Sequence, residues 1–178
     1  MIAGRNVALI GFMASGKTSV GEALSLRTGL PFRDVDGLIE RMEGATIAEI
    51  FATRGEPHFR EREGVLFREL CDGQDQIIGC GGGTLMDPRN RAALMTRCVA
   101  VWLRASVAET IRRIETPGAP VRPLVKGTDS RIIVPSLLRA REGLYEGADL
   151  LVETDGRTIE EITEEIRLAL ALPLREGL

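Results

Sequence analysis

The sequence predicts an α/β fold in which helices on both faces cover a central parallel sheet of about five strands. Short apolar runs that read as strands begin near residues 6, 31, 76, 98 and 150, and helical patterns separate them. Such alternation favours a parallel sheet, because each strand is followed by a helix that crosses back over the sheet. Residues 1–178 are therefore expected to form one domain of three α/β/α layers.

Composition excludes several classes of protein. The chain is 44% hydrophobic and 28% charged, with a formal net charge of −3. It has no basic stripe with aromatics, so nucleic acid is not expected as a partner, and no apolar run approaches the roughly 18 residues of a membrane span. Cys71, Cys80 and Cys98 form no C-x-x-C pair, which argues against a disulfide framework. With the first strand beginning near residue 6, no room is left for a signal peptide, and we expect a cytoplasmic monomer.

The segment Gly11 to Thr18 reads Gly-Phe-Met-Ala-Ser-Gly-Lys-Thr and fits the phosphate-binding pattern G-x-x-x-x-G-K-[ST]. It lies between a buried strand and a helical pattern, which is the context that the motif requires. Glycines allow a tight turn whose N–H groups point at one anion, and the helix that follows adds its positive end. Lys17 could then reach the terminal phosphates, and Thr18 could offer its hydroxyl to Mg²⁺.

Two carboxylates, Asp34 and Asp36, follow the second predicted strand. They point the same way if the strand continues and diverge if the chain turns. A D-x-D pair is by itself more often a helix cap. Next to a phosphate-binding loop, however, it is well placed to act on Mg²⁺ or on a nucleophile.

A helical insert between the second and third strands, about residues 35–63, is expected to form a pocket wall. Thr46 to Glu49 is a capping box, Gly55 ends that helix, and another helix follows to about Cys71. Glu63 falls on the apolar face of this second helix, and Arg60 is its i,i+3 neighbour. A charge on a buried face must be paired or bound to a ligand. An ordinary internal ion pair is the alternative interpretation.

The segments that follow the third and fourth strands suggest a binding loop and a lid. Gly81 to Gly83 follow a strand, where a ligand could approach the backbone closely, although a flexible loop would look the same. Residues 115–130 contain three prolines and two glycines without periodicity, which predicts a lid carrying Arg122. Helix returns from about Pro135 to Tyr145, with Arg141 on its apolar side.

Taken together, these motifs resemble those of shikimate kinases, which are P-loop kinases of the nucleoside-monophosphate-kinase-like family. The resemblance covers nearly the whole chain and rests on the loop plus five further segments: Phe32 to Asp36, Gly55 to Glu63, Gly81 to Gly83, Val121 to Leu124, and Arg141 to Tyr145 before Ala148-Asp149. Two departures, Gly143 before Leu144-Tyr145 and Pro135 in the preceding helix, bear on where Arg141 is placed.

The resemblance implies ATP-dependent phosphorylation of the 3-hydroxyl of shikimate, on the route to chorismate and the aromatic amino acids. Asp36 would act as base, with Lys17 and Arg122 assisting the transferred phosphoryl group. Thr18, and Asp34 through water, would hold Mg²⁺. Further ATP contacts are expected from Ala14, Ser15, Gly16, Ser19, Arg113 and Arg157, and further shikimate contacts from Arg60, Glu63, Gly81, Gly82, Gly83 and Arg141.

Two alternatives stay open at this point. A gluconate-kinase-like enzyme would use the same loop but would not need two arginines for a ring carboxylate. A non-catalytic nucleotide-binding regulatory module is less compatible with the presence of Lys17, Asp34, Asp36 and Arg122.

Overall fold

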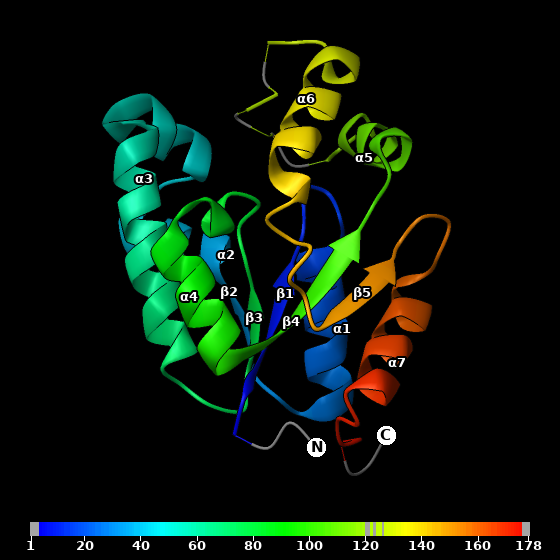
Figure 1. Cartoon of the computed structure of the whole chain (residues 1–178). Helices are drawn as coiled ribbons and strands as arrows, with labels where there is room; N and C mark the ends of the chain where they lie inside the picture. The colour runs from blue at the N-terminus through cyan, green and yellow to red at the C-terminus, as the bar shows by residue number, and fades with distance from the viewer. Residues whose placement is uncertain (1–3, 120–121, 123, 126, 176–178) are drawn as a thin grey trace.

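A parallel sheet of five strands lies at the centre of the computed structural model, which describes residues 4–119, 122, 124–125 and 127–175. The strands are β1 (Asn6–Ile10), β2 (Phe32–Asp34), β3 (Ile77–Gly79), β4 (Cys98–Arg104) and β5 (Leu150–Glu153). Their order is β2-β3-β1-β4-β5, and every neighbouring pair is parallel. Helices lie on both sides of the sheet (Figure 1). The predicted fold class is confirmed.

Alternate side chains of β1 belong to two hydrophobic cores, one on each face of the sheet. Val7 and Leu9 pack with α1 (Lys17–Thr28) and α7 (Ile159–Ala169), whereas Ala8 and Ile10 pack with α3 (Ile47–Cys71) and α4 (Pro88–Arg97). All five residues of β1 are buried. A strand covered on both faces reads as a continuous apolar run, and this explains why the sequence shows no alternation there.

The capping signals in the sequence mark helix starts in the structure. Thr46 and Thr158 form complete capping boxes at α3 and α7, and Asp87 caps α4 with Pro88 in its first position. Ser106 caps α5 (Val107–Ile114). Within α3, Gly55 has φ 83° and ψ 159°, a conformation that favours glycine, so the helix is interrupted where the sequence predicted an end.

After β2 the chain turns directly into α2 (Val35–Glu43) with Asp34 as its cap, which is one of the two courses that the sequence left open. One other segment differs from the prediction. Helix α6 (Ser130–Glu142) begins before Pro135, with Asp129 as its cap, so the helix start was predicted too late and Ser130 is not part of a lid. Pro135 is accommodated inside α6 with the loss of one main-chain hydrogen bond. Of the expected lid, residues 120, 121, 123 and 126 lie outside the described residues.

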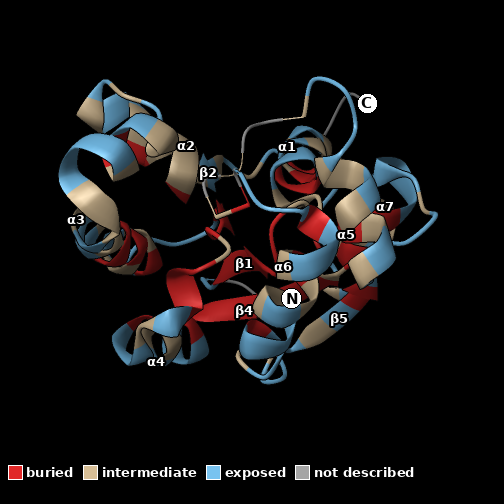
Figure 2. Cartoon of the chain, turned by 90° about the horizontal axis from the view of Figure 1, so that it is seen from above, coloured by how far each residue is buried: buried red, intermediate tan, exposed pale blue. Residues whose placement is uncertain are grey.

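Viewed from above, the buried strands occupy the centre and the helices present exposed surfaces around them (Figure 2). Helices α5 and α6 stand beyond the carboxyl ends of the strands (Figure 1). In parallel α/β folds, ligands bind at this end of the sheet. None of the described helices has both the length and the apolar character needed to cross a membrane.

Candidate active site

A cavity of about 990 Å³ opens at the carboxyl ends of the strands. Its wall combines the phosphate-binding loop with the start of α2, part of α3, the glycines after β3, and single residues from α5, the expected lid and α6. The size is that of a ligand site. Thirteen of the predicted site residues line it: Ala14, Gly16, Lys17, Thr18, Ser19, Asp34, Asp36, Arg60, Gly82, Gly83, Arg113, Arg122 and Arg141.

The loop between β1 and α1 has the tight geometry that its glycines predict. Gly16 has φ 96°, and a Cβ on Gly11 would stand 2.4 Å from the Leu103 carbonyl oxygen. Lys17 Nζ donates to the carbonyl oxygens of Gly11 at 3.0 Å and Phe12 at 2.7 Å. Burial lowers the pKa of Lys17 to about 8, against the opposing effect of Asp36, so the ammonium stays charged near neutral pH. Ser15, also in the loop, is 1% exposed and does not line the cavity.

Asp34 is both a helix cap and a partner of the phosphate-binding loop. Its Oδ1 accepts a hydrogen bond from the Gly37 N–H at 3.2 Å, and its Oδ2 accepts one from Thr18 Oγ1 at 2.7 Å. The helix-cap interpretation is thus confirmed for this residue, and the role on Mg²⁺ stays a prediction. The contact brings a carboxylate and a hydroxyl together beside Lys17, and oxygen donors of this kind suit Mg²⁺.

Asp36 lies in the first turn of α2 and faces the same cavity. Its Oδ1 is buried and has no hydrogen-bond partner among the described residues. Burial raises the pKa of Asp36 to about 7, with Glu63 and Asp34 adding to the effect. A carboxylate with a pKa near the working pH is suited to general-base catalysis.

Two of the three glycines after β3, Gly81 and Gly83, leave no room for a side chain. A Cβ on Gly81 would stand 2.3 Å from Glu63 Oε1 and 2.6 Å from Asp36 Oδ1, and one on Gly83 would stand 2.5 Å from Arg60 Nη1. The Gly82 carbonyl oxygen accepts from Tyr145 Oη at 3.1 Å. These contacts favour a fixed loop over the flexible loop that the sequence left open. Gly81 itself does not line the cavity.

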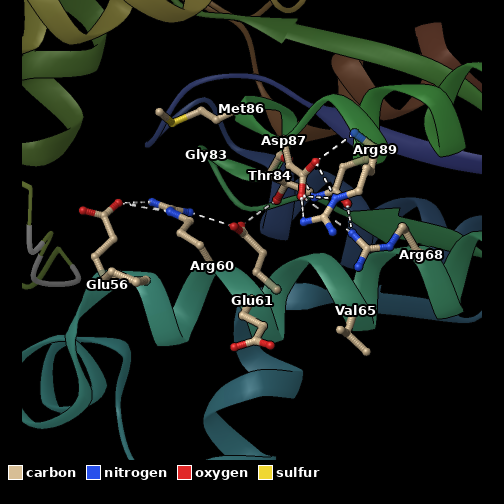
Figure 3. A pocket seen from close by; sticks show the side chains of 13 residues that line it. Glu56, Arg60, Glu61, Val65, Arg68, Gly83, Thr84, Met86, Asp87 and Arg89 are labelled. Atoms are coloured by element: carbon tan, nitrogen blue, oxygen red, sulfur yellow. Dashed lines mark hydrogen bonds and ion pairs between the residues drawn. The ribbon is translucent and has the colours of Figure 1, made fainter.

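Arg60 is held between two carboxylates of its own helix (Figure 3). Glu56 Oε1 accepts from Arg60 Nε at 3.1 Å and from Nη2 at 3.0 Å, and Glu63 Oε2 accepts from Nη1 at 2.8 Å. Glu63 Oε1 accepts in turn from Thr84 Oγ1 at 2.6 Å. Glu63 is 1% exposed and does not line the large cavity. Glu63 thus lies behind Arg60, and its expected contact with shikimate stays a prediction that its position does not favour.

A smaller hollow of about 500 Å³ lies between α3 and the segment from η1 (Thr84–Met86) to α4 (Figure 3). The hydrogen-bonded side chains of Arg60 and Glu63 lie at its edge. Arg60 and Gly83 line both spaces. Asp87 pairs with Arg89 at 2.7 Å, and Arg68 Nη1 donates to Asn90 Oδ1 at 2.6 Å. Most charged groups of this hollow thus form ion pairs or hydrogen bonds with neighbouring side chains. The large cavity is therefore the stronger candidate site.

Arg141, near the end of α6, is buried without an acidic partner. It is 6% exposed, lies over the Phe12 ring at 5.7 Å, and donates to the Gly82 carbonyl oxygen at 3.3 Å. Within the described part of the chain, no carboxylate lies within ion-pair distance of its guanidinium. Burial lowers its pKa from the ordinary value. A buried guanidinium of this kind favours an anion in the adjoining space.

The three remaining predicted arginines occupy different positions. Arg122 lines the cavity. Arg113 also does, and it joins the loop to β5 by donating to the carbonyl oxygens of Ala14 at 3.0 Å and Thr154 at 2.9 Å. Arg157 does not line the cavity: it donates to the carbonyl oxygen of Glu153 and pairs with Glu165 at 2.6 Å. The position of Arg157 thus does not favour the expected ATP contact.

Sequence reasoning missed several residues of the site. Thr84 directly follows the three glycines, yet nothing in the sequence indicated that its hydroxyl would donate to Glu63. Tyr145 was expected only as the end of the predicted helix, whereas its hydroxyl donates to the Gly82 carbonyl oxygen and burial raises its pKa to about 12. The apolar part of the cavity wall comes from Met13, Ile47, Phe51, Phe59 and Leu124.

Comparison with known proteins identifies the relatives of this chain. The model of the shikimate kinase family matches residues 13–171. The shikimate kinase of Cereibacter sphaeroides is 39% identical over 94% of this chain and 83% of its own length, and that of Geobacter metallireducens is 40% identical over 91% and 89%. The solved structure of shikimate kinase from Acinetobacter baumannii in complex with shikimate superposes with a TM-score of 0.87, at 34% identity and 96% coverage of both chains. A gluconokinase from Sinorhizobium meliloti, at 20% identity and a TM-score of 0.57, shares the fold.

Proposed function

Because this chain belongs to the shikimate kinase family, we infer that it transfers the terminal phosphoryl group of ATP to the 3-hydroxyl of shikimate. The product, shikimate 3-phosphate, lies on the route to chorismate and the aromatic amino acids. The family match favours this activity over both a gluconate-kinase-like enzyme and a non-catalytic regulatory module. Within the structure, the observation that carries the assignment is the Arg141 guanidinium, which is buried on the cavity wall with no carboxylate at ion-pair distance among the described residues.

A planar carboxylate fits that guanidinium. Arginine presents its N–H donors in a rigid fork that matches a carboxylate, and charge-assisted hydrogen bonds of this type are shorter and stronger than neutral ones. Arg60 lines the same cavity from α3, so two cations on separate helices face the space next to Asp36. We assign both arginines to the carboxylate of shikimate and Gly82 to the wall beside it.

The hydroxyl that accepts the phosphoryl group would lie against Asp36. The pKa of about 7 lets this carboxylate take up the hydroxyl proton near neutral pH. Lys17 and Arg122, both on the cavity wall, would balance the charge of the phosphoryl group during transfer. Phosphoryl transfer depends mainly on positioning and on charge stabilisation, which is what this set of side chains provides.

Mg²⁺ fits the oxygen donors at the mouth of the phosphate-binding loop. Thr18 Oγ1 and the Asp34 carboxylate are in contact, and Thr18 follows the lysine of the motif. When bound, the ion neutralises phosphate charge. Thr18 would hold it directly and Asp34 through water. Replacing Asp34 by Asn should raise the Mg²⁺ concentration needed for half-maximal activity, and an unchanged Mg²⁺ dependence would remove Asp34 from this role.

The nucleotide would extend from the loop toward α5. Contacts with ATP are assigned to Ala14, Ser15, Gly16, Lys17, Thr18 and Ser19 of the loop, and to Arg113, which donates a hydrogen bond to the Ala14 carbonyl oxygen.

A monomeric state and a cytoplasmic location remain predictions. Light scattering of the purified chain tests the first, and cell fractionation tests the second.

The decisive experiment measures ADP release with shikimate and with an analogue whose carboxylate is replaced by a neutral group. Each charge-assisted hydrogen bond is worth about 1.5–3 kcal/mol, so the analogue should be used roughly ten- to hundredfold less well for each bond lost. Lys17→Met serves as the inactive control, because its side chain serves the phosphates and its fold should persist. Equal use of acid and analogue would overturn the assignment of shikimate.

A further inference from the structure

Two of the three cysteines, which are far apart in the sequence, meet in the folded chain. Cys71 is the last residue of α3 and Cys98 is the first residue of β4, and their Sγ atoms lie 3.6 Å apart. Both are buried, at 2% and 0% exposure. The end of α3 and the start of β4, which carry the pair, lie at the end of the sheet opposite α5 and α6 (Figure 1). The pair is therefore separate from the active-site cavity.

The main chain around the two sulfur atoms is held together by further contacts. Asp72 forms an ion pair with Arg97, so the residues beside each cysteine are also bridged. Asn6 Nδ2 donates to the Cys71 carbonyl oxygen at 3.2 Å, and Arg5 donates to that of Cys98. A disulfide needs an S–S distance of about 2.05 Å. The two Sγ atoms, now 3.6 Å apart, thus have to approach each other to that bond length.

The electrostatics of the pair favour reaction at Cys98. A hydrogen bond with Cys71 lowers the pKa of Cys98, and the positive charges of Arg5 and Arg97 lower it further, although burial opposes them. The pKa of Cys71 is raised, first by its hydrogen bond with Cys98 and then by burial. Because the thiolate is the reactive form, Cys98 is the nucleophile of the pair.

We propose that Cys71 and Cys98 form a dithiol modification site that hydrogen peroxide closes to a disulfide. The Cys98 thiolate attacks one peroxide oxygen, the O–O bond breaks, and the hydroxide that leaves takes a proton to become water. Cys71 then attacks the sulfur of the Cys98 sulfenic acid, its own proton leaves with the hydroxyl as a second water, and the S–S bond forms. Two thiols lose two electrons in total, and one peroxide is reduced to two waters.

Access is provided by the ends of the elements that carry the pair. Residues 72–75, directly after Cys71, are exposed, as is Arg97 directly before Cys98. Ends of helices and strands open locally far more easily than the core unfolds. Cys80 offers a matched contrast: it follows β3, its N–H donates to the Leu9 carbonyl oxygen near the carboxyl end of β1, and burial raises its pKa.

The test exposes the folded, reduced full chain to hydrogen peroxide, then denatures it in excess alkylating agent and measures its intact mass. The wild type should lose two hydrogen atoms and keep one alkylatable thiol, and peptide mapping should join Cys71 to Cys98. Cys80→Ser should still form the link and keep no alkylatable thiol, whereas Cys71→Ser and Cys98→Ser should form no intramolecular link. The cross-link should raise the melting temperature by roughly 5–10 °C, because it closes a loop of about 28 residues.

Three results would overturn the proposal. One is three alkylatable thiols after peroxide treatment of the folded chain. Another is a link that includes Cys80. The third is a link between Cys71 and Cys98 that forms only after the chain has been unfolded in urea. Addition of a dithiol reductant to the oxidised wild type should restore both the original mass and the original melting temperature.

Discussion

Gly81→Ala is the substitution for which the structure gives the clearest expectation. The added Cβ would stand 2.3 Å from Glu63 Oε1, 2.6 Å from Asp36 Oδ1 and 3.2 Å from Thr84 Oγ1. Distances under 3.0 Å essentially never occur for a Cβ, so both carboxylates must move. Glu63 is 1% exposed and is held by Arg60 and Thr84, so it has no free space to move into, whereas Asp36 lines the cavity and would be pushed into it.

The expected loss follows from the size of that displacement. Relieving the two contacts needs shifts on the order of 1 Å, and a misplacement of that size can cost about 10²-fold in rate. Overpacking of a filled site costs about 1–3 kcal/mol in the free energy of unfolding, which lowers the melting temperature by roughly 2–4 °C for each kcal/mol in a chain of this length. We therefore expect kcat/KM for shikimate to fall about 10²-fold in a protein that still folds.

The assay is steady-state ADP release, with the melting temperature measured on the same samples. Gly147→Ala is the matched control, because a Cβ at Gly147 meets no atom within 4 Å and Gly147 does not line the cavity. It should retain wild-type activity and stability. If Gly81→Ala behaved like Gly147→Ala, the three glycines would not be held by close packing, and the flexible-loop interpretation would return.

Further predictions concern the charged groups of the cavity. kcat/KM should rise with pH through about 7, as Asp36 loses its proton, and Glu63→Gln should move this rise to lower pH because it removes a neighbouring negative charge. Asp36→Asn should lower the rate about 10²–10⁴-fold, and a normal pH profile in that variant would place the base elsewhere. Arg122→Ala should lower kcat by up to about 10³–10⁵-fold, and an effect confined to the shikimate KM would make Arg122 a positioning residue only. Arg141→Ala should raise the shikimate KM about ten- to hundredfold, and a parallel loss of ATP affinity by titration would contradict its assignment.

The sequence predicted best those features that depend on residues close together in the chain. These features are the spacing of Gly16, Lys17 and Thr18, the capping boxes, and the interruption of α3 at Gly55. Helix α6 begins before its predicted start near Pro135, because Asp129 caps it and the helix tolerates a proline in its interior. Local signals also left open whether Asp34 ends a strand or starts a helix.

Contacts between distant segments could not be predicted in the same way. Thr84 reaches Glu63 across 21 positions, and Tyr145 reaches Gly82 across 63. Helical spacing did predict that Glu63 would meet Arg60, but it could not show that the pair faces a hollow beyond the main cavity. The position of Arg141 depended on the path of α6 past Gly82, which only the folded chain reveals.

The clamp around Arg60 has a thermodynamic consequence. Its guanidinium already forms ion pairs with two carboxylates, and the side chain of Glu56 is 44% exposed whereas that of Glu63 is only 2% exposed. If a substrate carboxylate binds at Arg60 as proposed, it would displace Glu56 into water, and the net gain would be the difference between two similar ion pairs. Arg141 has no carboxylate to displace among the described residues, so under the same proposal it would contribute the larger share of the affinity. In the free protein, Glu56 and Glu63 balance the charge of Arg60.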